Sequence, residues 1–315
     1  MILTDYFLSQ RDITWDYARS CGVENAVIRL PETDDFDLTD AAHWQSLKKR
    51  FTDFSINPVI VEPMPNKLHD HIKAGDELCD ECIEKVIKMF AAMDKVSVRM
   101  ICFNFMAHIG WTRTRSDIPE RGGAYVTGFD INEFTPPADK KITESELWDN
   151  YTYFIKAVMP YAEKYNIKLA LHPDDPPLKQ LGSVCRIMIS AENIKKAMEI
   201  YKSDNLGITF CQATYKMMGE DIYKAIEDFK EKIFFVHFRN VRGNKYKFNE
   251  TFHDNGEIDM ADLMRHYKKC GVDAYIRVDH VPDMPGEKMD KTAGYNALGR
   301  LFAIGYLKGI LDSVG

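Results

Sequence analysis

The chain has 315 residues, of which 45% are hydrophobic and 28% are charged, a composition typical of ordinary soluble globular proteins. Its formal net charge of −7 gives it no basic footprint for nucleic acid or for an anionic membrane. No run of the sequence approaches the roughly 18 consecutive apolar residues that indicate a membrane span.

The amino terminus and the cysteines bear on the cellular compartment. The sequence begins Met1-Ile2-Leu3-Thr4-Asp5, without a basic region followed by a long apolar stretch, so we expect no signal peptide. The 7 cysteines are odd in number and scattered along the chain, which fits a reducing compartment better than a disulfide framework. We therefore expect a cytoplasmic protein.

Short β-rich runs alternate with longer amphipathic runs along the whole chain. We expect strands at 1–7, 25–30, 57–62, 98–105, 168–172, 206–211, 233–239 and 274–279. We expect helices at 76–93, 144–165, 191–201, 221–231, 260–270 and 294–311. Continuous apolar strands alternating with helices indicate parallel strands that are covered on both faces. Eight such rounds predict one (β/α)8 TIM barrel over residues 1–315.

The rival architecture is a doubly wound open sheet, which often shows a glycine-rich turn after its first strand. No such turn follows Phe7. The longest irregular stretch, 111–141, follows the fourth strand and is rich in Gly, Pro, Arg and Asp. Loops of this length in compact domains are usually functional or mobile. We interpret the stretch as a lid or a wall of the active site, with a plain surface loop as the alternative.

Four metal-ligating side chains stand at the ends of the last four expected strands. Because a barrel places its active site at the carboxyl ends of its strands, we consider them together. They are His172, Cys211, His237 and Asp279. Each alone has an ordinary structural explanation, but adjacent strands lie only about 5 Å apart, so the set predicts a metal site. Thiolate and imidazole suit Zn²⁺, Fe²⁺ or Co²⁺ and the carboxylate suits Mn²⁺, so the ligands alone do not choose the metal.

The neighbours of these ligands indicate what the site does. Arg239 lies two residues beyond His237 on the same strand face, where its guanidinium could pair with a substrate carboxylate. Arg277 bears the same relation to Asp279, and an ion pair elsewhere in the barrel is its alternative role. His280 is a candidate general acid or base, and Tyr295 is expected to point back over the rim of the barrel.

Three other segments carry polar residues of interest. His172-Pro173-Asp174-Asp175-Pro176-Pro177 is a stiff turn, since proline restricts both its own backbone and the preceding residue. Asp174 in this turn either caps a helix, supports a ligand or contacts substrate. His253 follows the seventh strand and could reach over the pocket. The charged run 227–232 indicates a solvated helix face.

Several stretches, in this order along the chain, match one known family. They are Asn104-Phe105-Met106, Trp111-Thr112-Arg113-Thr114, the His172 to Pro177 hexapeptide, Phe235-Val236-His237-Phe238-Arg239, Phe252-His253 with Gly256-Glu257-Ile258-Asp259-Met260, Asp279-His280, and Gly294-Tyr295 with Gly299-Arg300. On these residues the chain resembles the mannonate dehydratases, metal-dependent enzymes of the xylose-isomerase-like TIM-barrel group. The resemblance covers most of the chain from about Val59 onward, and the hexapeptide is its most specific part.

The resemblance implies a ligand set, a metal and a reaction. It makes His172, Cys211, His237 and Asp279 the ligands of Mn²⁺, with Fe²⁺, Co²⁺ and Zn²⁺ as alternatives, and His280 and Tyr295 the acid and base. The expected reaction removes water from an aldonic acid such as mannonate and yields a 2-keto-3-deoxy acid. The residues expected to contact this small sugar acid are Asn104, Asp174, Arg239, His253 and Arg277.

The chain departs from the family at two places. The family's amino-terminal Arg-Trp-Tyr-Gly is absent, and Met1 to Phe7 stands in its place. After Asn104-Phe105-Met106 the family usually carries Pro-Val-Leu-Asp, whereas this chain has Ala107-His108-Ile109-Gly110. Both departures fall on the substrate side of the pocket, so the metal and the reaction type are more strongly implied than mannonate itself.

Two alternative functions follow from the same barrel. One is a sugar isomerase or epimerase, although such enzymes tend to use a carboxylate-rich ligand set. The other is a non-catalytic, metal-containing sugar-acid binding protein, which fold alone does not exclude. The exposed helices of a barrel often support dimers, so a homodimer is an expectation that the sequence does not decide.

Overall fold

The computed structural model describes residues 1–287 and 292–314. Eight parallel strands close into a barrel in the neighbour order β1-β14-β11-β10-β7-β4-β3-β2. They are β1 (Ile2–Phe7), β2 (Asn25–Ile28), β3 (Asn57–Val61), β4 (Met100–Phe103), β7 (Lys168–Leu171), β10 (Leu206–Cys211), β11 (Ile233–Phe238) and β14 (Tyr275–Val278). Each lies within a strand expected from the sequence, so the predicted (β/α)8 barrel is confirmed.

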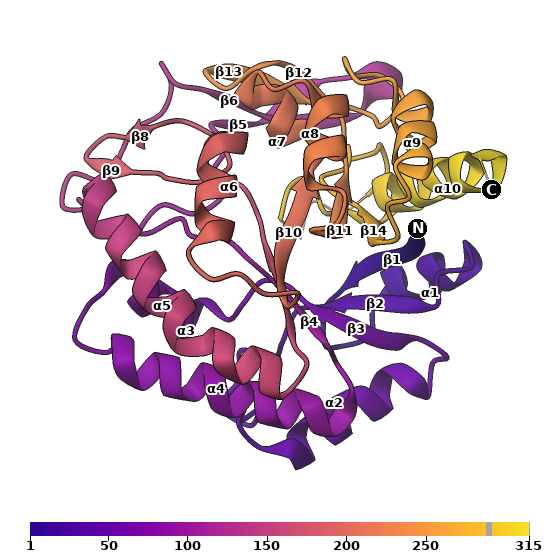
Figure 1. Ribbon diagram of the computed structural model, residues 1–315. Coiled ribbons are helices and arrows are strands. Elements are labelled where there is room, and N and C mark those ends of the chain that lie inside the picture. Colours follow the sequence, from indigo (N-terminus) through magenta and orange to yellow (C-terminus); the bar gives the residue numbers. More distant parts are fainter. Residues whose placement is uncertain (288–291, 315) are drawn as a thin grey trace.

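Helices lie around the outside of the strands (Figure 1). They are α1 (Ile13–Ser20), α2 (Ala41–Thr52), α3 (Asn66–Ala74), α4 (Cys79–Val96), α5 (Glu144–Lys164), α6 (Ala191–Glu199), α7 (Gln212–Met218), α8 (Ile222–Phe229), α9 (Met260–Lys269) and α10 (Ala297–Val314). Six of them match the predicted helices. A capping box explains the sharp start of α5, since Thr143 and Glu146 each accept a backbone N–H of the other. Within the described residues, none of these helices is both long and apolar enough to cross a membrane.

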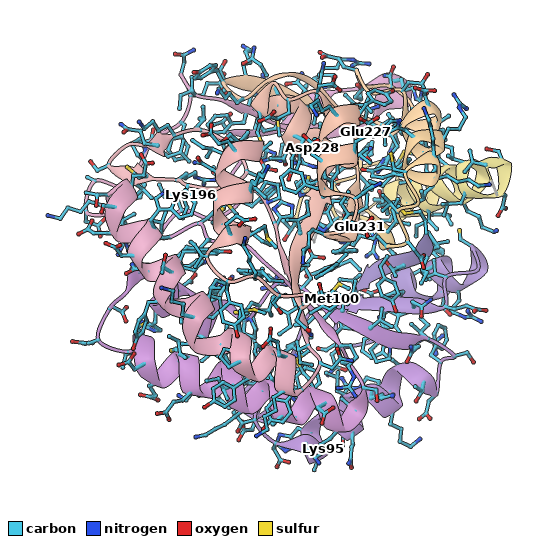
Figure 2. The ribbon with its side chains drawn as sticks, viewed as in Figure 1. Lys95, Met100, Lys196, Glu227, Asp228 and Glu231 are labelled. Atoms are coloured by element: carbon cyan, nitrogen blue, oxygen red, sulfur yellow. The ribbon has the colours of Figure 1, made fainter. Side chains whose placement is uncertain are left out.

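The inside of the barrel changes from apolar to polar along its strands. Its small apolar cluster includes Ile60, Met100 and Phe235, and Met100 is labelled near the centre of Figure 2. Two residues further along a strand the side chain points the same way, so the next inward layer can be read directly. In this next layer Glu62 follows Ile60 on the same strand face, and Cys102 follows Met100. In the same way His237 follows Phe235 and Arg277 follows Tyr275. The apolar layer therefore closes one end of the barrel and leaves polar groups at the carboxyl ends of the strands.

The stretch 111–141 is not irregular as predicted. It contains β5 (Arg115–Pro119) and β6 (Tyr125–Asp130), which join β12 (Val241–Asn244) and β13 (Lys247–Glu250) in an antiparallel sheet ordered β12-β13-β6-β5. This sheet lies at the top of the view in Figure 1. The prediction was wrong because β6 pairs with a strand that follows β11, a partner far along the chain that local composition does not indicate. A further short pair, β8 (Gln180–Leu181) and β9 (Val184–Cys185), follows the hexapeptide.

Candidate active site

A cavity of about 850 Å³ opens at the carboxyl ends of the barrel strands. Its walls come from both halves of the chain. They include Tyr6, Arg29, Glu62, Asn104, Trp111, His172, Asp175, His237, Arg277, Asp279, His280 and Tyr295. Trp111 makes the stretch after β4 one wall of this cavity, and whether the stretch also opens as a lid stays a prediction.

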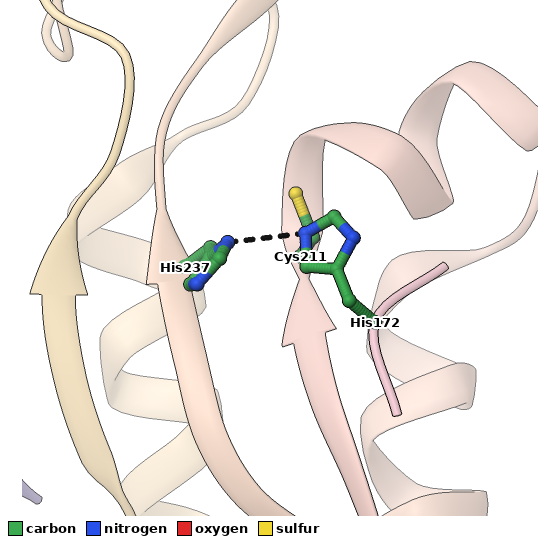
Figure 3. Close-up of side chains that lie close together, drawn as sticks. All are labelled: His172, Cys211 and His237. Carbon is green, nitrogen blue, oxygen red and sulfur yellow. Dashed lines mark hydrogen bonds between the residues drawn. The ribbon is translucent and has the colours of Figure 1, made fainter. Parts of the chain in front are cut away.

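Three of the four predicted ligands converge beside the cavity. His172 Nε2 lies 3.1 Å from His237 Nδ1, and Cys211 Sγ lies within 4.8 Å of both rings (Figure 3). They come from neighbouring strands, and Cys211 is paired directly with His237 in the sheet. Asp279 stands at the side of this group, with its Oδ2 at 3.5 Å from His237 Nδ1.

The hydrogens on the two imidazoles explain why this group fits a cation. His172 Nδ1 donates to the carbonyl of Pro173 at 2.6 Å, which leaves its Nε2 with a lone pair. His237 Nε2 lies 3.0 Å from Glu62 Oε1, and its Nδ1 is hydrogen-bonded to His172 Nε2 at 3.1 Å. With His172 Nε2 as the acceptor, His237 Nδ1 donates the hydrogen bond between them, and a metal ion bound by both nitrogens would take the place of that proton. Glu62 and Asp279 outweigh burial and Arg277 and hold the pKa of His237 well above its ordinary value.

The surroundings of Cys211 favour its thiolate form. Burial alone would raise the pKa of its thiol, but the positive charge of Arg239, together with the two neighbouring histidines, outweighs burial and holds that pKa well below its ordinary value. Arg239 Nε donates to Cys211 Sγ at 3.2 Å. The thiolate is the form of cysteine that binds metals, so the donor set of two imidazoles, a thiolate and a nearby carboxylate fits a divalent metal ion.

A second group lies deeper in the barrel and shares His237. Glu62, Cys102 and His237 bring their donor atoms within 4.8 Å of one another. Burial and the charge of Glu62 raise the pKa of the Cys102 thiol to about 11, so Cys102 stays a neutral thiol. Arg277 donates to both oxygens of Glu62, at 2.8 and 3.0 Å. The deeper group is therefore an ion-paired support for His237 rather than a place for a second ion.

A buried network of charges braces the hexapeptide, and the sequence analysis missed most of it. Asp175 accepts from Arg113 at 2.8 and 3.0 Å and from Arg239 at 2.5 Å. Glu250, which ends β13, accepts from the same two arginines. Burial would raise the pKa of Glu250, but Arg239 and Arg113 lower it to about 2. The network ties the turn after β7 to the small antiparallel sheet.

The two arginines expected to bind substrate are both engaged in ion pairs. Arg239 is fully buried, does not line the cavity, and donates to Cys211, Asp175, Thr214 and Glu250. We therefore correct its expected contact with substrate to a supporting role. Arg277 lines the cavity, but its guanidinium pairs with Glu62 and, at 2.9 Å, with Asp279, which is the alternative that the sequence left open.

Asp174 and His253, which were also expected to contact substrate, lie outside the lining of the cavity. Asp174 is fully buried and its Oδ2 accepts from the backbone N–H groups of Ile187 and Met188, so it fixes the turn. His253 is fully buried and donates to the carbonyl of Phe238 at 2.8 Å. Both expectations are corrected, because the backbone turns these side chains into the protein.

The remaining predicted residues face the cavity. Asn104 lines it, and its side-chain oxygen accepts from the N–H of Met106 at 3.1 Å. Tyr295 donates to Asp279 Oδ1 at 3.4 Å, and His280 Nε2 lies 3.6 Å from the same oxygen. The two candidate proton-transfer groups therefore stand side by side over one carboxylate, with ring centroids 5.4 Å apart.

His280 is held in an unusual backbone conformation. Its φ of 37° lies in the left-handed region, which costs free energy for a residue with a side chain. The ring is fixed by Glu250, whose Oε1 lies 2.9 Å from Nδ1, and by Trp111, whose ring centroid lies 4.9 Å away. The fold thus keeps a strained residue in place at the mouth of the cavity.

Comparisons with known proteins agree with this geometry. The family model described as D-mannonate dehydratase (UxuA) matches residues 2–139 and 135–315. Mannonate dehydratase 2 of Halalkalibacterium halodurans is 30% identical, over 85% of this chain and 86% of its own length. The crystal structure of mannonate dehydratase from Streptococcus suis serotype 2 superposes with a TM-score of 0.90 at 25% identity, covering 100% of this chain and 95% of that one.

A more distant solved structure shares the fold alone. The xylose isomerase domain protein of Planctomyces limnophilus superposes with a TM-score of 0.62 at 12% identity, over 99% of this chain and 97% of its own. The family model, by contrast, spans both halves of the barrel, including the first strand, where the expected amino-terminal motif is absent. The chain therefore belongs to the D-mannonate dehydratase family, whose members are metal-dependent hydro-lyases on a xylose-isomerase-like barrel.

Proposed function

We propose that this protein is a dehydratase that removes water from an aldonic acid to give a 2-keto-3-deoxy acid, with D-mannonate as the first substrate to test. The observation that carries the proposal is the pair of facing ring nitrogens of His172 and His237, 3.1 Å apart, next to the buried sulfur of Cys211. His172 and His237 line the same cavity as Tyr295 and His280.

His172, Cys211, His237 and Asp279 would hold one divalent metal ion, with Mn²⁺ as the first choice and Fe²⁺, Co²⁺ or Zn²⁺ as alternatives. Such an ion, when bound, acts as a Lewis acid that polarises the carboxylate of the substrate and eases loss of the adjacent C2 proton. Asn104 and Arg277 line the same cavity and remain our proposed substrate contacts.

His280 is suited to take the C2 proton. With a hydrogen on Nδ1, it donates to Glu250 at 2.9 Å, and this tautomer leaves the lone pair on Nε2. Arg239 Nη1 also lies near Nδ1, at 3.0 Å, and acts in this tautomer as a neighbouring positive charge rather than as a donor. Glu250 thus orients the base as a carboxylate does in other catalytic histidine pairs.

Tyr295 is suited to protonate the departing 3-hydroxyl. Burial and the charge of Asp279 raise the pKa of its phenol well above the ordinary value, so the group keeps its proton near neutral pH. Its hydroxyl points to Asp279 Oδ1 at 3.4 Å, on the same side as His280. An acid and a base at neighbouring positions match what removal of water from adjacent carbons requires.

The alternatives are less well supported by the same residues. A sugar isomerase or epimerase tends to use a carboxylate-rich ligand set, whereas Cys211 and two histidines form this one. A non-catalytic binding protein has no need of the strained His280 or of Tyr295 beside it. A cytoplasmic location and a homodimer are further proposals that rest on the sequence.

The test is to incubate the Mn²⁺-loaded protein with a panel of aldonic and uronic acids and to follow formation of 2-keto-3-deoxy product. We expect at least one aldonic acid to lose water, and a Cys211→Ser variant to form no product. Isomerised sugar without loss of water would identify an isomerase instead. Binding of a sugar acid without any turnover would identify a binding protein, and either outcome would contradict the proposal.

A further inference from the structure

A second cluster of metal-ligating side chains lies between two outer helices, away from the cavity. Glu227 of α8 and His266 of α9 bring Oε1 and Nε2 to 3.4 Å, and the Sγ of Cys270 lies 3.4 Å from the same Nε2. All three donor atoms lie within 4.8 Å of one another. None of these residues lines the catalytic cavity, so the cluster is a separate feature.

The helices hold two of these donors in a fixed relation. His266 and Cys270 are one turn apart on α9, and side chains four residues apart on a helix are neighbours on its surface. Cys270 ends the helix, and its backbone N–H donates to the carbonyl of His266 at 2.9 Å. The imidazole also packs edge-on against the ring of Tyr223, with centroids 5.0 Å apart. Both donors are therefore placed by regular helix and by packing rather than by a loop.

The neighbouring helix contributes oxygen donors. Glu227 lies on α8 toward α9 (Figure 2), while Asp228 beside it pairs with Lys224 at 3.0 Å. The backbone carbonyl of Tyr223 lies 3.1 Å from His266 Nε2. One imidazole nitrogen is thus surrounded by a thiol, a carboxylate and a carbonyl. The expected solvated helix face is confirmed for both residues, since Glu227 and Asp228 are exposed, and Glu227 belongs to this cluster as well.

We propose that Glu227, His266 and Cys270 bind a zinc ion that links α8 to α9. Zinc prefers cysteine, histidine and carboxylate donors in a tetrahedron at about 2.0–2.3 Å, which places donor atoms about 3.3–3.6 Å from one another. The two distances of 3.4 Å match that spacing. The ion replaces the hydrogen on His266 Nε2 and the proton of the thiol, and the fourth position falls to the Tyr223 carbonyl or to water.

The proposed ion would act as a structural clip. Within the described residues, side-chain hydrogen bonds already join α8 to α9, from Tyr223 to Asp262 at 2.8 Å and from His266 to the Tyr223 carbonyl at 3.1 Å. Binding to the folded state alone raises stability in proportion to the logarithm of the free metal concentration over Kd. Zinc is therefore expected to raise the melting temperature without taking part in turnover.

The test counts zinc ions on the metal-stripped full chain, kept under a non-chelating reductant, by equilibrium dialysis and elemental analysis. We expect the wild type to bind two zinc ions per chain and Cys270→Ser to bind one, with unchanged Mn²⁺-dependent turnover. Cys211→Ser is expected to bind one ion, and the variant that combines Cys211→Ser with Cys270→Ser is expected to bind none. Co²⁺ bound to Cys211→Ser should show the near-ultraviolet band of a thiolate ligand, because Cys270 remains. Zinc is expected to raise the melting temperature of Cys211→Ser but not of the double variant.

Cys21→Ser is the matched control, because Cys21 is also a half-buried free cysteine that ends a helix, and it should still bind two ions. Glu227→Gln, at an exposed side chain, should weaken the second ion without affecting the fold. A single zinc ion on the wild type would overturn the proposal. So would two ions on Cys270→Ser, or an equal loss in Cys21→Ser and Cys270→Ser.

Discussion

The two halves of the barrel contribute different chemistry to one cavity. The carboxyl-terminal half, β7, β10, β11 and β14, supplies the four proposed metal ligands at or just beyond its strand ends. The amino-terminal half, β1 to β4, supplies a wall that includes Tyr6, Arg29 and Asn104. The sequence resemblance implies the metal ligands in the first of these, and the two expected departures from the family's motifs fall in the second. We therefore expect the metal chemistry to rest mainly on the carboxyl-terminal half, and the amino-terminal half to contribute mainly to the substrate wall, to which Arg277 of the other half also belongs.

Glu62 is the point at which the halves meet. It follows β3 in the amino-terminal half, yet its carboxylate lies 3.0 Å from His237 and binds Arg277 through both oxygens. Burial would raise the pKa of Glu62, but Arg277 and His237 lower it far below its ordinary value, so it stays ionised. Substitutions in each half, followed by measurements of turnover, KM and Mn²⁺ affinity, therefore test how independently the two halves act.

Among the substitutions Tyr295→Phe, Glu62→Gln and Asn104→Ala, we expect the largest loss at Tyr295, the proposed proton donor. Tyr295→Phe removes one hydroxyl, keeps the ring that packs against His280, and should lower kcat by about 10² to 10⁴-fold. Mn²⁺ content should stay at the wild-type level, because Tyr295 is not among the proposed ligands. Steady-state kinetics together with metal analysis check both points, and a variant with full activity would refute the assignment.

A smaller loss, in Mn²⁺ affinity, is expected at Glu62, where the two halves of the barrel meet. Glu62→Gln keeps the shape of the side chain but removes the charge that orients His237 and neutralises Arg277. Residues that orient a metal-bound histidine typically contribute about 10 to 100-fold in metal affinity, and we expect a loss in that range. Titration with Mn²⁺ measures it. An unchanged affinity would mean that the carboxyl-terminal half holds its metal without help from β3.

The smallest effect is expected on the substrate wall. Asn104→Ala removes a neutral hydrogen-bonding group, worth about 0.5–1.5 kcal/mol, so KM should rise by about 2 to 10-fold. Mn²⁺ affinity should not change, since Asn104 lies in the half without ligands. If the metal affinity fell as much as in Glu62→Gln, the separation of the two halves would be wrong.

Much of the fold was visible in the sequence because its signals are local. Every barrel strand is a short apolar run, and the rule that barrel sites lie at the carboxyl ends of strands was enough to group His172, Cys211 and His237. Glu62 carried the same signal, since it is the last residue of the predicted strand 57–62, and applying the rule to all eight strands would have found it.

The errors arose where a partner lies far along the chain. Glu250 follows Arg113 by 137 residues, and nothing near either one indicates their ion pair. Without that partner, Arg239 looked free to bind substrate, and β5 and β6 looked like irregular chain. Asp174 and His253 failed for a related reason, because position beyond a strand does not say whether the backbone turns a side chain toward the cavity or away from it.

The most direct measurement compares two buried cysteines that stand on opposite sides of His237. Cys211 belongs to the proposed metal group and Cys102 to the deeper ion-paired group, and neither forms a disulfide. Mn²⁺ affinity and turnover should be lost in Cys211→Ser and stay close to wild type in Cys102→Ser. Equal losses in the two variants, or Mn²⁺ binding and turnover in Cys211→Ser, would contradict the account.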